Sequence, residues 1–483
     1  MIKLNVDCLY LIVSELSQNH KSLHSCILVN REWCRLVVPM LWMKHTWYSC
    51  LNYEAKKKLY NIMLSFLSST SKQLLLDNNI KIPLSILSKP PLFNYISFCN
   101  FPDYSHVENI MKITFENEFD KWEENQKNLL KQEIYKLFVS QCKNIKKLLL
   151  KTSQPLFSFP GASICFSQLY SLYINLKFVN SDTLYKAKQI CKNLNELVIF
   201  ISQCNRLISL IDAQRNLQCV TIKFSDDEFD FDSKELGKAL AKKSDTINDL
   251  DLDSIRIIPP SFLISFVNLK SISINSCYYR KEYIKEEIEL QQYLAISEFK
   301  KLQKLYVRTH LSCFKELAML IEKTEGNILS VCISSENIAK DAGVLIKAIS
   351  NHCPKIKYLT ISITPKDFIY VKLLLNCKYL TSLDLCGEKN FEDEDNNNNN
   401  IGDELLNILT KYSPKTLTKI SINKYWKYSI DALERFFESI RGRTLSNFKI
   451  YPNVEDVTED YKAVVKRYID EGVIKKTNFW LKY

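Results

Sequence analysis

Histidine and cysteine are the side chains of this chain most able to do chemistry, and neither forms a catalytic or metal-binding pattern. The 483 residues include 6 histidines and 16 cysteines. No Cys-x-x-Cys pair provides the ligand spacing of a zinc ribbon or a dithiol redox site. The motifs G-x-S-x-G, G-x-x-x-x-G-K-[ST], G-x-G-x-x-G and H-E-x-x-H are also missing. We therefore expect a protein that is not an enzyme and that uses no metal and no cofactor, with a hidden hydrolase or ligand sensor as an alternative.

Acidic clusters are the next candidates for cation binding. Residues 226–232 read Asp-Asp-Glu-Phe-Asp-Phe-Asp, and residues 392–395 read Glu-Asp-Glu-Asp before five asparagines. A calcium loop of the EF-hand type needs a central glycine and a terminal glutamate, which the first cluster lacks. Tracts of this composition cannot bury a core, so we expect solvated loops at both places.

Charge and hydrophobicity limit the possible partners. The 65 basic and 54 acidic residues give a formal net charge of +11, and the longest basic runs are as short as Lys56–Lys58. No run has the length of a nucleic-acid-binding patch. The apolar run Leu9–Val13 is too short for a signal peptide or a membrane span. These features predict an intracellular protein, cytoplasmic or nuclear, with no nucleic-acid and no membrane partner.

A repeated frame organises most of the chain. It consists of three apolar residues in the pattern apolar-x-x-apolar-x-apolar, as in Leu194, Leu197 and Ile199. From Ile145 to Leu445, eleven steps cover 300 residues, about 27 residues per step. Cysteines stand three residues before several frames, at Cys142, Cys191, Cys353 and Cys377. The first residues of the twelve frames are Ile145, Leu169, Leu194, Leu217, Ile247, Leu269, Leu302, Ile328, Ile356, Leu380, Leu417 and Leu445.

This period is typical of leucine-rich repeats, whose strand reads L-x-x-L-x-L. The cysteines before the strands resemble those of the cysteine-containing type. We therefore predict an α/β fold, a leucine-rich-repeat solenoid in which a curved parallel sheet carries helices on its convex side. An ordinary α/β domain is the alternative. The solenoid is expected over residues 142–452, with a C-terminal cap at 453–483.

Residues 1–48 differ from the repeats and predict three short helices. Three stretches, Leu4–Ile12, Leu23–Trp33 and Pro39–Trp42, together resemble an F-box, although Asn5 stands where that family usually has proline. The resemblance implies docking on a Skp-type adaptor and, through it, on a cullin–RING ubiquitin ligase. A generic helical capping unit is the alternative. By position, the resemblance implies a set of residues that face the adaptor or hold the surface that does, with the two tryptophans as its best anchors. They are Leu4, Leu9, Ile12, Val29, Trp33, Leu41 and Trp42.

Residues 49–141 are expected to connect the F-box to the solenoid and to cap its first repeat. A helix is predicted over 121–142, and Phe93–Phe98 fits the repeat frame as a degenerate first strand.

The substrate surface is expected on the concave face, where the strand residues between the core positions point. Aromatic, arginine and aspartate side chains there suit protein recognition. The candidates are Tyr173, Phe200, Asp251, Asp253, Tyr306, Arg308, Tyr358 and Asp384. The sequence thus predicts the substrate receptor of an SCF-type ligase that binds an unknown protein substrate. A repeat scaffold that binds a partner without ubiquitin transfer is the alternative.

Overall fold

A computed structural model gives the fold of the chain. It describes residues 5–16, 19–47, 51–87, 91, 93–116, 118–201, 207–224, 234–253, 258–276, 284–335, 341–387, 401–422, 426, 428–450 and 459–477. The chain forms two compact units, Met1–Leu217 and Gln218–Tyr483. The boundary between the units falls inside the predicted repeat region, after its third strand. The acidic clusters at 226–232 and 392–395 lie outside the described residues.

Three helices begin the first unit, as predicted: α1 (Val6–Leu16), α2 (His20–Ile27) and α3 (Arg31–His45). Asn19 and Asn30 cap α2 and α3, because their side chains accept hydrogen bonds from backbone N–H groups of the first turn. The helices share a small core that includes Val13, Leu23 and Val37.

Further helices follow before the first strand. They are α4 (Tyr53–Ser65), α5 (Ser69–Asp77), α6 (Leu84–Leu87), η1 (Tyr95–Phe98), α7 (Tyr104–Thr114), η2 (Phe119–Lys121) and α8 (Glu124–Gln141). The predicted helix over 121–142 corresponds to α8.

The prediction of a degenerate strand at Phe93–Phe98 is wrong, because this segment contains the 3-10 helix η1. The Asn94 side chain accepts a hydrogen bond from the Ser97 N–H, and the Ser97 hydroxyl donates to the Asn94 carbonyl. These local bonds close a turn, which competes with strand pairing.

Strands of the first unit pair in parallel in the order β1 (Lys147–Leu150), β2 (Ser171–Asn175) and β3 (Glu196–Ile201). Leu148 lies opposite Leu172, which lies opposite Leu197, so the middle positions of the repeated frame form one row. The connecting elements are η3 (Leu156–Ser158), α9 (Ala162–Phe166), α10 (Ser181–Ile190) and α11 (Ile208–Asp212).

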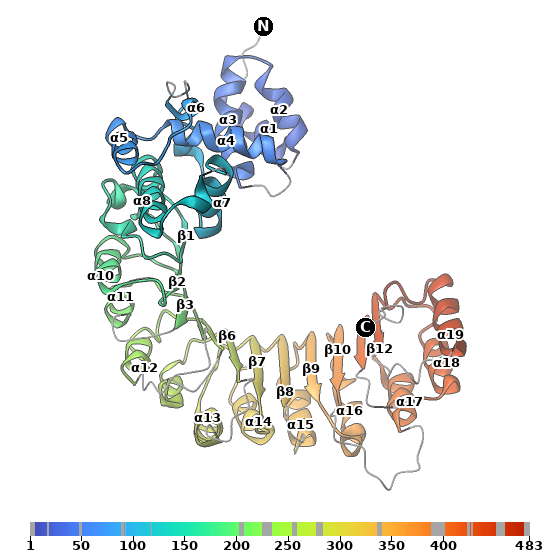
Figure 1. The fold of residues 1–483 in the computed structure, drawn as a ribbon. Helices are drawn as coiled ribbons and strands as arrows, with labels where there is room; N and C mark the ends of the chain where they lie inside the picture. The colour runs from blue at the N-terminus through green and yellow to red at the C-terminus, as the bar shows by residue number, and fades with distance from the viewer. Residues whose placement is uncertain are drawn as a thin grey trace. The chain divides into compact units, whose positions relative to one another are not determined.

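The second unit continues the same strand–helix alternation. Its parallel strands are β4 (Cys219–Phe224), β5 (Asp249–Leu252), β6 (Ser271–Asn275), β7 (Lys304–Thr309), β8 (Ser330–Ser335), β9 (Tyr358–Ser362), β10 (Ser382–Cys386), β11 (Lys419–Ile422) and β12 (Asn447–Ile450). Its helices are α12 (Lys234–Ala241), η4 (Pro260–Ser265), α13 (Ile284–Ile296), α14 (Phe314–Glu322), α15 (Ala342–His352), η6 (Pro365–Asp367), α16 (Phe368–Leu374), α17 (Gly402–Tyr412), α18 (Ile430–Ser439) and α19 (Glu459–Asp470). In Figure 1, helices α13 to α16 lie along one side of strands β6 to β10.

All described side chains of the twelve apolar frames are buried, and only that of Ile450 is not described. The helices cover this side of the strands, which leaves the other side as an open face. The predicted α/β solenoid with a parallel sheet is therefore confirmed.

The end of the second unit is closed by α19 and the segment after it. Short parallel bridges join Leu445 to Ile474 and Phe448 to Thr477. Tyr468 on α19 is fully buried, with its ring 4.9 Å from that of Phe437. These contacts cover the last strand of the unit, which would otherwise expose backbone groups and apolar side chains.

Cysteines occupy the predicted place between helix and strand. Cys142, Cys191 and Cys353 are the residues that end α8, α10 and α15, and all three are buried. The Cys191 thiol lies 3.7 Å from the Phe166 carbonyl oxygen of the preceding repeat. Burial raises the pKa of Cys191 and of Cys353 from 9.0 to about 12. Both thiols are therefore neutral at physiological pH.

The first prediction concerns these thiols. In the folded chain at neutral pH, iodoacetamide should modify the exposed Cys8 and leave Cys191 and Cys353 unmodified, because the reagent attacks an accessible thiolate. Mass spectrometry before and after unfolding in urea measures this difference. The raised pKa of Cys191 also links the stability of the fold to pH. Its contribution to the free energy of unfolding is present below about pH 9 and is lost as the pH rises toward about 12. Rapid labelling of Cys191 in the folded protein would contradict the burial.

Candidate functional site

The first helix has an unusual surface for so small a unit. Helix α1 is rich in apolar residues, yet Leu9 and Val13 are its buried residues. Apolar residues of a helix normally face a core. Here Leu11 is 66% exposed, and Val6, Tyr10 and Ile12 are exposed as well.

A second exposed apolar pair lies where α2 ends. Leu28 is 86% exposed and Val29 is 58% exposed. We call these six residues the N-terminal apolar surface: Val6, Tyr10, Leu11, Ile12, Leu28 and Val29. Exposed apolar groups gathered on one small unit are typical of a protein-docking site.

The predicted adaptor residues divide between this surface and the core. Ile12 and Val29 are exposed, whereas Leu9 and Leu41 are buried. Trp33 is partly buried and packs against the core of the three helices. Leu4 lies outside the described residues. The Asn5 side chain accepts a hydrogen bond of 3.4 Å from the Asp7 N–H, so it caps the start of α1 in place of proline.

Sequence reasoning missed Val6, Tyr10, Leu11 and Leu28 on this surface. The signal was present for α1, because apolar residues outnumber its polar residues Asp7, Ser14 and Glu15 and exceed what one core-facing stripe requires. No sequence pattern distinguished Leu28 from a core leucine.

Trp42 has an internal role. Its ring stacks on that of Tyr95, with centroids 4.3 Å apart and planes inclined by 20°. Near it, the Trp47 Nε1–H donates to the Asn100 carbonyl over 3.0 Å, and the Asn100 amide donates to the Met43 carbonyl over 2.8 Å. These contacts fix the end of α3 against the segment around η1.

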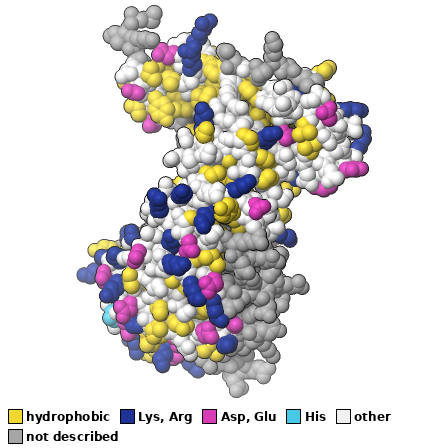
Figure 2. Space-filling model, turned by 90° about the vertical axis from the view of Figure 1, so that its left-hand side faces the viewer, with side chains coloured by type: hydrophobic (Ala, Val, Ile, Leu, Met, Phe, Trp, Pro, Cys, Tyr) yellow, Lys and Arg dark blue, Asp and Glu magenta, His cyan; other side chains and the backbone are white. Residues whose placement is uncertain are grey.

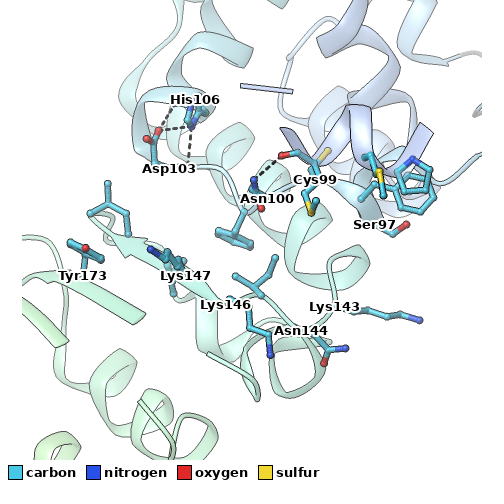
Figure 3. A pocket seen from close by; sticks show the side chains of 18 of the residues that line it. Ser97, Cys99, Asn100, Asp103, His106, Lys143, Asn144, Lys146, Lys147 and Tyr173 are labelled. Atoms are coloured by element: carbon cyan, nitrogen blue, oxygen red, sulfur yellow. Dashed lines mark hydrogen bonds and ion pairs between the residues drawn. The ribbon is translucent and has the colours of Figure 1, made fainter. Parts of the chain in front are cut away.

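A recess lies beside this junction, within the first unit. Its volume is about 1010 Å³, and its walls come from α3, from residues 97–106 and from residues 143–149 that form and precede β1. Figure 3 shows Lys146, Asn144 and Lys143 along one border, with Asp103 and His106 on another. The apolar walls include Leu36, Met40, Phe98, Phe101 and Ile145.

The open face of the sheet in the second unit is polar and mixed in charge. The strand register places Asp251 beside Ser273 and Tyr306 beside Cys332. Thr360 then lies beside Asp384. The small side chains of Cys332 and Thr360 separate Tyr306 from Asp384 in this register.

Several of the predicted substrate residues lie near one another on this face. Asp253 accepts a hydrogen bond of 3.0 Å from the Asn275 amide, and Asn275 lies opposite Arg308 in the register. Tyr358 on β9 is exposed. Burial raises the pKa of Asp384, while Ser421 and Lys449 act in the opposite direction.

Tyr173 and Phe200 belong to the first unit and are separate from that group. The Tyr173 hydroxyl donates to the Glu196 carboxylate over 3.1 Å, and the Ser171 hydroxyl donates to the same carboxylate over 2.5 Å. Phe200 lies opposite Asn175 on the neighbouring strand and is partly exposed.

The described residues form neither a metal-ligand cluster nor a membrane-spanning helix. Within the described ranges, no three His, Cys, Asp or Glu residues come together as metal ligands would. Of the helices that the structure describes, none combines the length and apolar content needed to cross a membrane. Figure 2 shows Lys and Arg interspersed with Asp and Glu on the face it presents, with no continuous basic track.

Comparisons with known proteins assign no family. No protein-family model matches the chain. No curated protein matches it either. Among solved structures, a chain from the crystal structure of the Rad7 and Elc1 complex in yeast is similar over 95% of this chain and 96% of that chain, at 15% identity and a TM-score of 0.39. A likeness of this size transfers neither a function nor a partner to this chain.

The second prediction tests the Trp42–Tyr95 contact. In a double-mutant cycle with Trp42→Leu and Tyr95→Leu, the two substitutions should be non-additive by about 0.5–1.5 kcal/mol in the free energy of unfolding, because each removes the same ring contact. Urea denaturation of the four proteins gives the coupling energy. The pair Trp33→Leu and Tyr95→Leu is the control and should be additive. Additivity of the first pair would show that the stacking contributes nothing to stability.

Proposed function

We propose that this chain is an F-box and leucine-rich-repeat substrate receptor of an SCF-type cullin–RING ubiquitin ligase. The observation that carries the proposal is the N-terminal apolar surface, on the same three helices whose residues resemble an F-box. Complete burial of a side chain such as Leu28 in an interface contributes about 1.5–3 kcal/mol. Uncovered, the same surface favours aggregation, which supports a stable partner for it.

The proposed division of labour uses two separate surfaces. The adaptor covers Ile12, Leu28 and Val29, while Leu9 and Leu41 hold the helices beneath them in place. The substrate binds on the open faces of the strands. Trp42 and Trp47 join the adaptor-binding helices firmly to the rest of the first unit, through Tyr95 and Asn100. A firm junction suits a receptor, because a bound substrate must be held at a defined place relative to the ligase.

We assign no catalytic step to this chain. A cysteine that accepts ubiquitin must form a thiolate at neutral pH. Burial raises the pKa of Cys165, Cys191, Cys313 and Cys353 to about 12, which opposes such a role for these four. In the proposal, ubiquitin transfer is the work of the partner proteins.

The third prediction concerns adaptor docking. The double substitution Leu28→Asp and Val29→Asp should weaken binding of a purified Skp-type adaptor at least about thirtyfold, because charged groups would replace apolar contacts in the interface. Isothermal titration calorimetry with the full chain measures the change. Both side chains are exposed, so the thermal stability of the chain should be unchanged.

Leu84→Asp is the matched control, because Leu84 is 85% exposed and lies on α6, outside the N-terminal apolar surface. This variant should bind the adaptor like the unmodified chain. Absence of adaptor binding by the unmodified chain, or equal binding by the double variant, would remove the basis of the proposal.

A cellular experiment separates the ligase receptor from a scaffold without ubiquitin transfer. Deletion of residues 1–48 should raise the abundance of proteins bound by the strand faces if the chain directs their degradation. Unchanged abundance with retained binding would support the scaffold.

A further inference from the structure

The recess of the first unit has a lining that combines apolar walls with unpaired positive charge. Most of the apolar residues that line the recess are buried or partly buried, among them Met40, Phe98 and Leu148. Large apolar walls beside a sheet favour a ligand that carries at least one large apolar side chain.

Four cationic side chains border the same recess: Arg35, Lys143, Lys146 and Lys147. All four residues are exposed. Within the described part of the chain, none of the four forms an ion pair with a carboxylate. Their charges are therefore available to an acidic ligand.

Asp103 is the acidic residue of the lining, and its carboxylate is already engaged. It accepts hydrogen bonds from the His106 N–H over 2.8 Å and from the Ser105 hydroxyl over 2.7 Å, as the cap of α7. Burial lowers the pKa of His106, against the opposing effect of Asp103, so the imidazole is largely neutral at neutral pH. Asp103 keeps its negative charge, because these donors are neutral, so one arginine and three lysines leave the lining with an excess of positive charge.

The recess adjoins the open face of the sheet. Lys147 and Leu149 are exposed residues of β1, and Leu149 lies opposite Tyr173 of β2. Figure 3 shows Tyr173 and Lys147 near each other at the border of the recess. An extended peptide lying on these strands can therefore place a side chain in the recess while its backbone follows the open face.

We infer that this recess binds an acidic peptide segment of a partner protein, with a large apolar side chain inserted between α3 and β1 and with carboxylates facing the four cations. The recess shares Tyr10 with the N-terminal apolar surface, and its other lining residues lie outside that surface. The meaning of peptide binding as substrate recognition rests on the proposed function. A single-stranded nucleic acid is the less suitable occupant. It requires a row of stacking surfaces and a basic track, and the charged residues here surround a single apolar recess.

Selection from a randomised dodecapeptide library displayed on phage, with the full chain as bait, tests the inference. The enriched sequences should contain several Asp or Glu residues around Leu, Phe or Trp. The most enriched sequence, made as a fluorescein-labelled peptide, should bind at least about tenfold more weakly to a Lys146→Glu, Lys147→Glu variant in fluorescence anisotropy. Binding should also weaken as the salt concentration rises.

Two further variants separate recess binding from general electrostatic attraction. The double variant Lys188→Glu, Lys192→Glu has the same change in net charge as the Lys146→Glu, Lys147→Glu variant. Lys192 also has an equivalent place in its repeat, because it follows Cys191 as Lys143 follows Cys142. These two lysines belong to the first unit and do not line the recess, so this variant should bind the peptide like the unmodified chain. Met43→Gln, which removes an apolar side chain from the lining, should weaken peptide binding without a change in net charge.

Several results would overturn the inference: no enriched peptides, enrichment of basic peptides, equal binding by the recess variants, or displacement of the peptide by oligothymidine that itself requires Lys146 and Lys147. The same variants are also titrated with the adaptor. Peptide binding without adaptor binding would remove the ligase proposal and leave the recess assignment intact. Adaptor binding without peptide enrichment would remove the recess assignment alone.

Discussion

Burial of the same three apolar positions in every repeat is the interaction on which the rest of the structure depends. A strand of four to six residues with one short helix cannot enclose its own apolar side. Each repeat becomes stable only when its row of leucine, isoleucine or valine meets the rows of its neighbours. The parallel register follows from this requirement, because a shift of one residue would turn the apolar side chains toward solvent. The polar side chains of the open face are then held in equally regular rows.

The N-terminal helices differ from the repeats in how many of their apolar residues are buried. Their shared core is small, and α1 has more apolar residues than that core can enclose. The excess remains on the surface, at α1 and at the end of α2. The firm attachment of these helices relies on a few aromatic and amide contacts around Tyr95 and Asn100. Different residues of these three helices therefore serve stability and binding. Leu9 and Leu41 hold the helices together, and Leu28 and Val29 remain available to a partner.

The sequence predicted the repeated elements better than it predicted the candidate sites. Frames such as Leu194, Leu197 and Ile199 were recognised because burial repeats with a fixed period. The segment at Phe93–Phe98 has the same apolar spacing, yet Asn94 and Ser97 close a turn there, and periodicity contains no information on such local bonds. Trp42 is predicted as an adaptor anchor from its position and its aromatic type, whereas its stacking partner is more than fifty residues away in the chain. Whether the adaptor also touches Trp42 stays a prediction.

The recess could not be predicted because its parts are distant in sequence and ordinary in type. Arg35, Asp103 and Lys146 look like solvated residues when each is considered with its chain neighbours. Only the fold brings α3, residues 97–106 and the start of β1 around one cavity. The open face of the second unit differs in chemistry, since Asp251, Asp253 and Asp384 give it acidic positions. Burial raises the pKa of Asp384, so a hydrogen-bond donor from a ligand would compensate its partial loss of solvation. The recess therefore favours carboxylates, whereas the second open face, which also carries the exposed Lys304, Arg308 and Lys419, offers both charges to a ligand. In the proposed receptor role, each surface would select a partner by the arrangement of its charges, and overall charge alone would not identify one.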